Sequence, residues 1–167
     1  DITPQRSSGT YGNNPLATTN GSATVTVTHA SHGAATGDTV YIKGAATVAT
    51  VQVGGISGTM SSNAFTSANG SNRVTVNHTA HGLADNDIVY FSGASDFGGI
   101  TAATYINVAG GLRVQVVTAD VYWIWVGVEA TSSASGGGTP TYEYAKPYAI
   151  TVVNGNSYTI TASSSAN

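Results

Sequence analysis

The sequence has no cysteine and very few charged residues. None of its 167 residues is Cys, and Asp, Glu, Lys and Arg together make up 8%, whereas about 25% is usual in soluble domains. The missing cysteine excludes disulfide bonds and thiolate metal sites, but it leaves the redox compartment open. Ser, Thr, Gly and Asn must therefore supply most of the polar surface.

Basic clusters and long apolar runs are also missing. The net charge is −3, and the five Lys and Arg residues are scattered singly, so no basic stripe is available to neutralise a nucleic-acid backbone. No apolar run approaches the roughly 18 residues of a membrane span, and no signal-peptide pattern is present. We therefore expect neither nucleic-acid binding nor membrane insertion. Because the chain begins at Asp1, we expect a processed product or a fragment of a longer protein.

The residues that are present favour β structure. Hydrophobic residues make up 41% of the chain, and Val, Ile, Thr and Tyr recur along it, as is typical of pleated, half-buried strands. No segment has helical periodicity beyond a turn or two. The length allows one ordinary domain or two small ones that share a core. The composition predicts an all-β fold.

The strongest pattern is an internal duplication, which we call the front segment. Its first copy runs from Asn20 to Ala45 and its second from Asn69 to Ala94, with no gap between the aligned positions. The recurring residues of the first copy are Asn20-Gly21-Ser22, Val25-Thr26-Val27, His29, His32-Gly33, Asp38, Val40-Tyr41 and Gly44-Ala45, and those of the second are Asn69-Gly70-Ser71, Val74-Thr75-Val76, His78, His81-Gly82, Asp87, Val89-Tyr90 and Gly93-Ala94. Such self-similarity indicates a repeated structural unit.

Each front segment predicts a strand, a turn and a second strand. Alternation from Ala23 to Thr28 places Val25 and Val27 on one face. The Asn-Gly, His-Gly and Gly37-Asp38 pairs (Asn86-Asp87 in the second copy) favour turns. Residues 39–43 then return as the next strand.

A second repeat follows the two front segments. Val116-Val117, Tyr122 and Ile124 match Val152-Val153, Tyr158 and Ile160 at constant spacing, and Asn154-Gly155 predicts a two-residue hairpin turn. The order front, front, hairpin, hairpin fits either one unit inserted into another or a single continuous sandwich. We favour insertion, with two related small antiparallel β-barrels or sandwiches: an outer module of residues 18–60 plus 145–167 and an inner module of residues 61–144.

The remaining segments are linkers and weaker strands. Residues 1–17 are polar, contain Pro4 and Pro15, and predict an N-terminal arm or linker. Residues 132–139 form a Ser/Gly-rich loop by composition. Residues 112–117 and 140–144 are predicted strands.

The repeated motif resembles a module common in the structural proteins of tailed bacteriophages. The resemblance rests on Asn-Gly-Ser, Val-Thr-Val, Thr-His-x-x-His-Gly, Gly-Asp-x-Val and Gly-Gly-Ile, and on the hairpin from Ile150 to Thr161. In that group a tail such as residues 130–139 and an aromatic strand such as Tyr142-Glu143-Tyr144 follow the hairpin. The fold also resembles the small β-barrel half-domain of ubiquitin-activating enzymes, and Asp1-Ile2-Thr3-Pro4 looks like a junction of phage tail proteins.

The chain departs from that pattern in two places. The first front segment is followed by a second one in place of its own hairpin, which favours insertion. The last hairpin ends at Asn167 without a Gly-rich tail and aromatic strand. A missing final strand would leave one sheet edge unpaired. Either the chain is cut from a longer protein, or another element completes that edge.

The histidines and aspartates admit a chemical and a structural interpretation. His29 and His32, like His78 and His81, have an H-x-x-H spacing, but each pair spans a strand end and a turn, and zinc needs further ligands. His32 with Asp38, or His81 with Asp87, could orient a base, yet no serine stands in a nucleophile context. We expect His29, His32, Gly33, Asp38, His78, His81, Gly82 and Asp87 to shape turns, with no catalytic residue, metal or cofactor. The Asn-Gly-Ser triplets match glycosylation sequons, but we expect turns there.

The hairpins differ in one informative way. Their alignment sets Trp123 opposite Thr159 and Trp125 opposite Thr161, so period two puts Tyr122 and Ile124 on the core face. Both tryptophans then lie on the other face, where they meet a partner or pack against the outer unit. Trp123 and Trp125, with Tyr142 and Tyr144, are the candidate binding residues.

The resemblance to the phage module implies a structural component of a virion, in a phage tail, nozzle or fibre, and the patterns above favour a non-enzymatic role. Its expected partners are other virion proteins or copies of itself, and it would act as a spacer, decoration or host-attachment module. The alternative is a module that binds host-surface glycans through an exposed aromatic face. A third possibility is an extracellular repeat protein, bacterial or synthetic, unrelated to virions.

Overall fold

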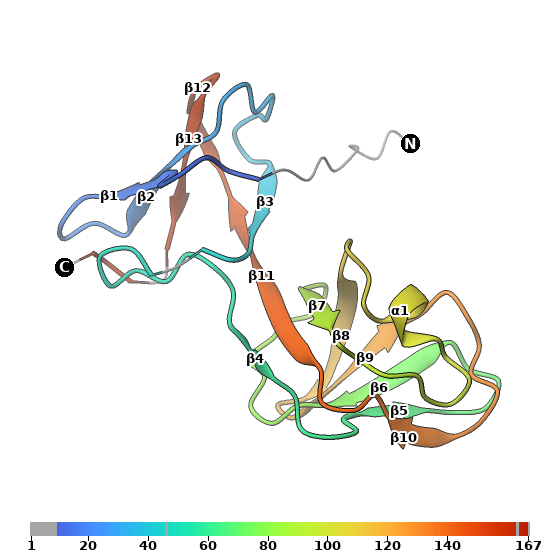
Figure 1. Cartoon of the computed structure of the whole chain (residues 1–167). Helices are drawn as coiled ribbons and strands as arrows, with labels where there is room; N and C mark the ends of the chain where they lie inside the picture. Colours follow the sequence, from blue (N-terminus) through green and yellow to red (C-terminus); the bar gives the residue numbers. More distant parts are fainter. Residues whose placement is uncertain (1–9, 46, 163, 167) are drawn as a thin grey trace. The chain divides into compact units, whose positions relative to one another are not determined.

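The fold is all-β, as the composition predicts, with strands paired in two antiparallel sheets. A computed structural model describes residues 10–45, 47–162 and 164–166. Its elements, labelled in Figure 1, are β1 (Leu16–Thr18), β2 (Thr24–Thr28), β3 (Thr39–Ile42), β4 (Ser57–Thr59), β5 (Phe65–Ser67), β6 (Arg73–Asn77), β7 (Ile88–Ser92), α1 (Ala102–Tyr105), β8 (Leu112–Thr118), β9 (Val121–Trp125), β10 (Ala134–Gly136), β11 (Thr141–Ala149), β12 (Thr151–Asn154) and β13 (Ser157–Thr161). Within the described ranges no helix is long and apolar enough to span a membrane.

The chain forms two compact units. Unit 1 consists of the described residues within 1–40, 46–53 and 148–167, and unit 2 of those within 41–45 and 54–147. β11 begins in unit 2 and ends in unit 1.

Unit 1 is built on a sheet of order β1-β2-β13-β12. Val25 pairs with Ile160 and Val27 with Tyr158 across β2 and β13. All four side chains are buried, because alternation along both strands turns the same positions inward. The Tyr148 hydroxyl donates to the Val53 carbonyl at 2.9 Å.

Unit 2 repeats this arrangement and extends it. Its strands belong to a sheet of order β10-β5-β6-β9-β8-β7-β11-β3, in which β4 pairs with β11, and β3 and β11 each also have residues in unit 1. Val74 pairs with Ile124 and Val76 with Tyr122, and all four are fully buried. Phe65 adds a stacked contact with Phe97, their ring centroids 5.5 Å apart.

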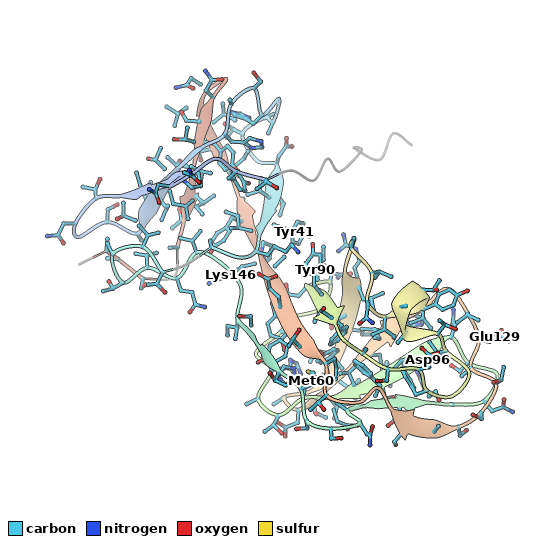
Figure 2. The ribbon with its side chains drawn as sticks, viewed as in Figure 1. Tyr41, Met60, Tyr90, Asp96, Glu129 and Lys146 are labelled. Carbon is cyan, nitrogen blue, oxygen red and sulfur yellow. The ribbon has the colours of Figure 1, made fainter. Side chains whose placement is uncertain are left out.

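Side chains at the periphery of this core join its loops to it. Met60, labelled in Figure 2, is buried in the same core. Asp96, also labelled there, accepts a hydrogen bond from the Ala102 amide at 2.7 Å and holds the start of α1.

The two units are nested in the chain. The front segment of unit 1 pairs with the last hairpin through β2 and β13, whereas that of unit 2 pairs with the nearer hairpin through β6 and β9. In sequence, residues 54–147 of unit 2 thus lie between the described residues of 46–53 and those of 148–167, both of which belong to unit 1. The module bounds expected from the sequence, residues 18–60 plus 145–167 and residues 61–144, stay a prediction.

The backbones of the two units bend at matching positions. Residues with positive φ recur in pairs at one constant interval along the chain: Asn14 and Asn63, Gly21 and Gly70, Ser31 and Ala80, Gly33 and Gly82, Gly37 and Asn86, Gly44 and Gly93, Ala49 and Gly98, Thr50 and Gly99. The structural repeat therefore extends beyond the stretch with recognisable sequence identity, from residues 14–51 to residues 63–100.

Several local expectations need correction. Part of the predicted arm, residues 1–9, lies outside the described residues, but β1 of the same segment is a strand paired with β2. The expected loop of residues 132–139 contains β10, which pairs with β5. The hairpin turn is Gly155-Asn156, one residue later than predicted, because a bulge near Val152 shifts the register before Asn154 pairs with Ser157.

Candidate functional site

His32 and His81 hold equivalent turns through both ring nitrogens. In unit 1 the Ala34 amide donates to His32 Nδ1 at 3.1 Å, and His32 Nε2 lies 2.8 Å from the Asn154 carbonyl. In unit 2 the Leu83 amide and the Thr118 carbonyl make the same contacts with His81. Because an amide must donate to Nδ1, the proton of the neutral ring sits on Nε2 and is donated to the carbonyl. Neither nitrogen of these rings is left for a metal or a substrate.

Asp38 and Asp87 close the next turn in each unit. Asp38 Oδ2 accepts from the Ala35 amide and Asp87 Oδ2 from the Ala84 amide, both at 2.8 Å. Neither carboxylate is hydrogen-bonded to a histidine ring among the described residues. Gly33 and Gly82, with φ of 62° and 64°, provide the left-handed bends beside them.

His29 and His78 occupy equivalent positions with different partners. His78 Nδ1 lies 2.6 Å from the Tyr144 hydroxyl, and burial, aided by repulsion from His81, lowers the pKa of His78. In unit 1 the ring of Tyr11 lies against His29, and its hydroxyl is 2.7 Å from that of Tyr158.

No metal-binding group can be assembled from these side chains. Among residues 10–45, 47–162 and 164–166, no cluster of three or more His, Asp or Glu side chains is arranged to hold an ion.

The two tryptophans lie on the face of β9 that points away from the core. Tyr122 and Ile124 are fully buried, as the alternation predicts, while Trp125 is 44% exposed. The Trp123 and Trp125 rings meet edge to face at 6.5 Å, and the Arg73 guanidinium stacks 4.0 Å above the Trp123 ring. Such a stack holds the Trp123 indole in place and keeps a positive charge beside it.

Trp125 also forms one wall of a shallow cleft. The cleft has a volume of about 350 Å³ and is lined by Asp85, Asn86, Arg113, Val114, Gln115 and Trp125. Its charged groups are held by the backbone: Asp85 accepts from the Val116 amide at 2.7 Å, and Arg113 donates to the Asn86 carbonyl at 3.0 Å. An exposed indole thus stands beside fixed donors and acceptors.

The cleft has no chemical counterpart in unit 1. The repeat places Thr36 at the position of Asp85, Ala149 at that of Arg113, Thr151 at that of Gln115 and Thr161 at that of Trp125. The local backbone is nevertheless the same, since the Val152 amide donates to Thr36 as the Val116 amide donates to Asp85. Unit 2 alone therefore carries the aromatic and charged side chains on this face.

Tyr142 and Tyr144 do not join the tryptophan face. They lie on β11, which is separated from β9 by β8 and β7. Tyr144 is 6% exposed, so it belongs to the core and not to a binding surface. Tyr142 is half-buried and lines a different hollow.

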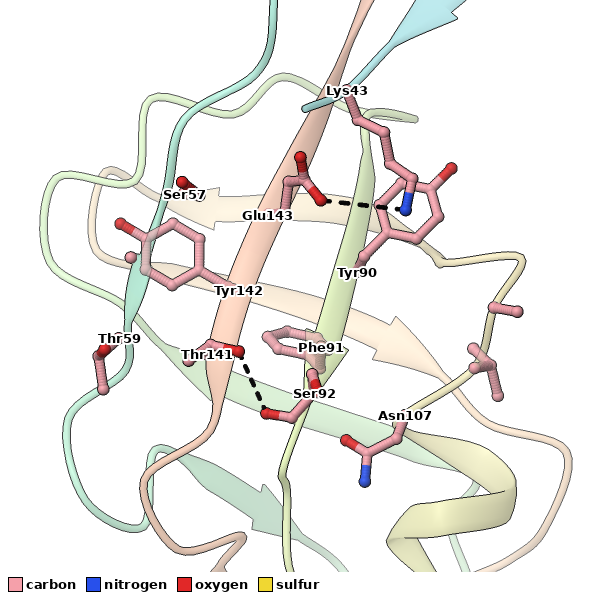
Figure 3. A pocket seen from close by; sticks show the side chains of 13 residues that line it. Lys43, Ser57, Thr59, Tyr90, Phe91, Ser92, Asn107, Thr141, Tyr142 and Glu143 are labelled. Atoms are coloured by element: carbon pink, nitrogen blue, oxygen red, sulfur yellow. Dashed lines mark hydrogen bonds and ion pairs between the residues drawn. The ribbon is translucent and has the colours of Figure 1, made fainter. Parts of the chain in front are cut away.

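That second hollow is an open groove of about 700 Å³ over β4, β11 and β7. Figure 3 shows the Lys43 side chain extending over the Tyr90 ring toward Glu143, with its ammonium 4.1 Å from the ring centroid and 3.9 Å from the carboxylate. Thr141 donates to the Ser92 carbonyl along the groove floor. Because its two charges neutralise each other, the groove offers no net charge to a ligand.

Sequence patterns missed Asp85, Arg113 and Gln115. They lie on a turn and on β8, where no motif marks them, but a comparison of the two repeats, position by position, would have found them. The same comparison found Trp123 and Trp125.

Comparisons with known proteins add a partial likeness of fold. No protein-family model and no curated protein matches the chain. Among solved structures, the endosialidase of phage phi92 is similar over 65% of this chain and 14% of its own, with 22% sequence identity and a TM-score of 0.44. The chain thus spans about one seventh of that protein, and a likeness of this extent assigns neither family nor activity.

Proposed function

We propose that this chain is an architectural β-module of a tailed-phage tail or fibre, acting as a spacer or attachment domain on the particle. The observation that carries the proposal is the duplicated framework, in which His32, His81, Asp38 and Asp87 accept hydrogen bonds from backbone amides of their own turns. These side chains stabilise the same turns in both units. The motif resemblance given above supplies the virion setting.

A nearly uncharged, Ser/Thr-rich surface fits this role. With 8% charged residues, copies of the chain or neighbouring virion proteins can pack together with little electrostatic repulsion. Antiparallel sheets with short edge strands also resist unwanted edge-to-edge association.

The location of the chain on the particle tests the architectural role. Antibodies against the folded chain, applied to purified particles of a phage that encodes it, should label one fixed position in electron micrographs. If the antibodies label no position on otherwise intact particles, the proposal is refuted.

A second function, saccharide binding, is favoured by the Trp125 cleft. Sugar rings have an apolar face that packs on an indole and hydroxyls that bond to planar side chains. Trp125, Arg113 and Gln115 offer both, and unit 1 has Thr or Ala at the same positions. The ligand would be a glycan of the host surface.

A glycan array separates this function from the architectural one. The wild-type chain should bind a subset of glycans, and Trp125→Ala should abolish the signal. Thr161→Ala changes the equivalent position of unit 1 and should leave the signal unchanged. An array without signal for the wild-type chain would remove the saccharide function and leave the architectural one in place.

A further inference from the structure

The sequence contains three Asn-Gly pairs, a dipeptide in which the asparagine can lose its side-chain amide by hydrolysis. The pairs are Asn20-Gly21, Asn69-Gly70 and Asn154-Gly155. In each, the glycine amide nitrogen can attack the asparagine Cγ, because glycine has no Cβ to hinder the approach. The attack needs an amide that is free of a hydrogen-bond acceptor and a side-chain carbonyl that can carry negative charge.

Two of the three pairs are held in a form that resists this reaction. The Gly21 amide donates to the Ala166 carbonyl at 2.8 Å. The Gly70 amide donates to the Ala130 carbonyl, also at 2.8 Å. Each amide must therefore leave its acceptor before it can react, as it must before it can exchange its hydrogen with solvent.

The third pair lies in the hairpin turn of unit 1 without that protection. Asn154, Gly155 and Asn156 are exposed, and the Gly155 amide has no acceptor among the described residues. A Cβ added at Gly155 would meet no atom within 4 Å. The peptide between Asn154 and Gly155 therefore has room to turn toward the asparagine side chain.

The Asn154 side chain is already folded back over this turn. Its Oδ1 accepts a hydrogen bond from the Asn156 amide at 2.8 Å, which is the Asx turn that asparagine favours. This bond keeps the side chain over the peptide that follows it and polarises the side-chain carbonyl. The same donor would stabilise the negative charge that develops on Oδ1 during attack at Cγ, as the donors of an oxyanion hole do.

We propose that Asn154 is a site of spontaneous hydrolytic deamidation, whose product loosens the contact of this hairpin with the turn of residues 29–32. The Gly155 nitrogen gives its proton to solvent hydroxide and forms a bond to Asn154 Cγ. The Cγ–Nδ2 bond breaks, ammonia leaves with a proton from water, and a cyclic succinimide remains. Water then opens the ring at either of its two carbonyls, which gives aspartate or isoaspartate. Nothing is oxidised or reduced, and the reaction does not depend on whether the chain belongs to a virion.

The effect on unit 1 follows from the groups that this turn holds. The Asn154 carbonyl accepts from His32 Nε2 at 2.8 Å. Asn156 Oδ1 accepts from the Ser31 amide at 3.0 Å, and the Asn156 carbonyl accepts from the His29 amide at 2.8 Å. Isoaspartate adds a methylene group to the main chain and makes the former Asn154 carbonyl a free carboxylate. Asn156 is then displaced, and its bonds to Ser31 and His29 weaken.

Unit 2 makes the same contacts with residues that cannot react in this way. Thr118, Ala119 and Asp120 occupy the three positions of the turn. The Thr118 carbonyl lies 2.9 Å from His81 Nε2, and Thr118 Oγ1 accepts from the Asp120 amide at 3.2 Å. Asp120 Oδ1 accepts from the Ala80 amide at 2.7 Å. The turn therefore forms without an Asn-Gly pair, and unit 2 supplies the substitutions for a control.

Peptide mass spectrometry of the full chain tests the proposal. The folded chain is stored in mildly alkaline buffer for several weeks, and samples are cleaved with trypsin. Cleavage after Lys43, Arg73 and Arg113 places the three Asn-Gly pairs in different peptides. The peptide with Asn154 should deamidate at least about tenfold faster than the other two, because their glycine amides react only after local opening. In concentrated urea, where no amide keeps a folded partner, the three rates should converge.

Two variants make the test specific, and each introduces the residue of unit 2. Asn154→Thr removes the reacting amide and should leave no deamidation at this position. Gly155→Ala keeps the amide but places a Cβ beside the attacking nitrogen, so it should slow the reaction by about tenfold or more. Hydrogen exchange of the β2 and β13 amides reports that both variants remain folded.

Hydrogen exchange also measures the effect of the product on unit 1. In the stored chain, the His29 and Ser31 amides should exchange faster than in the fresh chain, because their acceptors are on Asn156. The equivalent amides of unit 2, those of His78 and Ala80, have their acceptors on Asp120 and should not change.

Two results would overturn the proposal. One is a folded chain in which Asn154 keeps its side-chain amide for as long as Asn20 and Asn69 do. The other is a stored chain in which Asn154 has become isoaspartate while the His29 and Ser31 amides exchange as slowly as before.

Discussion

The bend at residues 49–50 of unit 1 predicts that two substitutions to glycine stabilise the chain. Ala49 and Thr50 have φ of 43° and 67°, in the left-handed region, while the equivalent residues of unit 2 are Gly98 and Gly99. A left-handed residue with a Cβ costs about 1–2 kcal/mol of folding free energy. Glycine removes that cost, but it loses about 0.5–1 kcal/mol because the unfolded chain has more conformational freedom. We expect Ala49→Gly and Thr50→Gly each to stabilise unit 1 by about 0.5–1 kcal/mol.

The reverse substitution at the equivalent position gives the opposite sign. A Cβ at Gly98 would lie 2.0 Å from Ser67 Oγ and 3.0 Å from the Ser132 carbonyl. The left-handed φ and the forced displacement together should destabilise unit 2 by at least about 2 kcal/mol in Gly98→Ala. The two positions thus form a matched pair within one chain.

Urea unfolding with a probe for each unit measures both effects. Trp123 and Trp125, the two tryptophans of the sequence, lie in unit 2, so their fluorescence reports Gly98→Ala. Hydrogen exchange of the β2 and β13 amides reports the two substitutions in unit 1. If Ala49→Gly and Thr50→Gly destabilise unit 1, as glycine does in an ordinary loop, then the bend is not left-handed there and the two backbones differ.

Other predictions concern buried tyrosines and a histidine. The Tyr122 hydroxyl is buried near that of Tyr144, but it meets the geometric criteria for a hydrogen bond with no group of the described residues. Tyr122→Phe should therefore stabilise unit 2 by up to about 1 kcal/mol in urea titrations, whereas Tyr158→Phe loses the Tyr11 bond and should cost about 1 kcal/mol. Burial raises the pKa of Tyr122 and of Tyr158 above 10.0, so the unfolded chain ionises first and stability should fall above pH 10 in unfolding curves. The pKa of His78 is lowered from 6.5, so the unfolded chain takes up a proton first and stability should fall as pH drops below 6.5. His78→Gln should weaken this acid dependence, with His29→Gln as the control in unit 1, and an unchanged profile in His78→Gln would contradict the assignment.

The sequence predicted the parts of the fold that alternate or bend at glycine. Val25, Val27, Tyr122 and Ile124 alternate with polar or outward residues, and all four are fully buried. Strands long enough for two or three inward positions show this pattern clearly. The strands of the front segments and hairpins are therefore predictable from the sequence alone.

Short edge strands could not be predicted in this way. β1 and β10 have three residues each, too few to show a period, and Ala134-Ser135-Gly136 has no strand propensity. Its pairing depends on the Ser67 hydroxyl and the Phe65 ring, which are distant in sequence. The bend at Ala49-Thr50 was hidden for a different reason, because unit 1 keeps the backbone there without the glycines that mark it in unit 2.

The two copies also show where the chain has changed its chemistry. The turns keep histidine and aspartate with nearly identical hydrogen-bond lengths, and the inward positions of the sheets keep Val, Tyr and Ile. The outward positions differ, with Thr24, Thr159 and Thr161 in unit 1 against Arg73, Trp123 and Trp125 in unit 2. Trp123 is half-buried and stacks with Arg73, whereas Trp125 is 44% exposed. That the outward face of β9 contacts a partner stays a prediction, and it rests on Trp125, because the fold in unit 1 forms with Thr161 at the equivalent position.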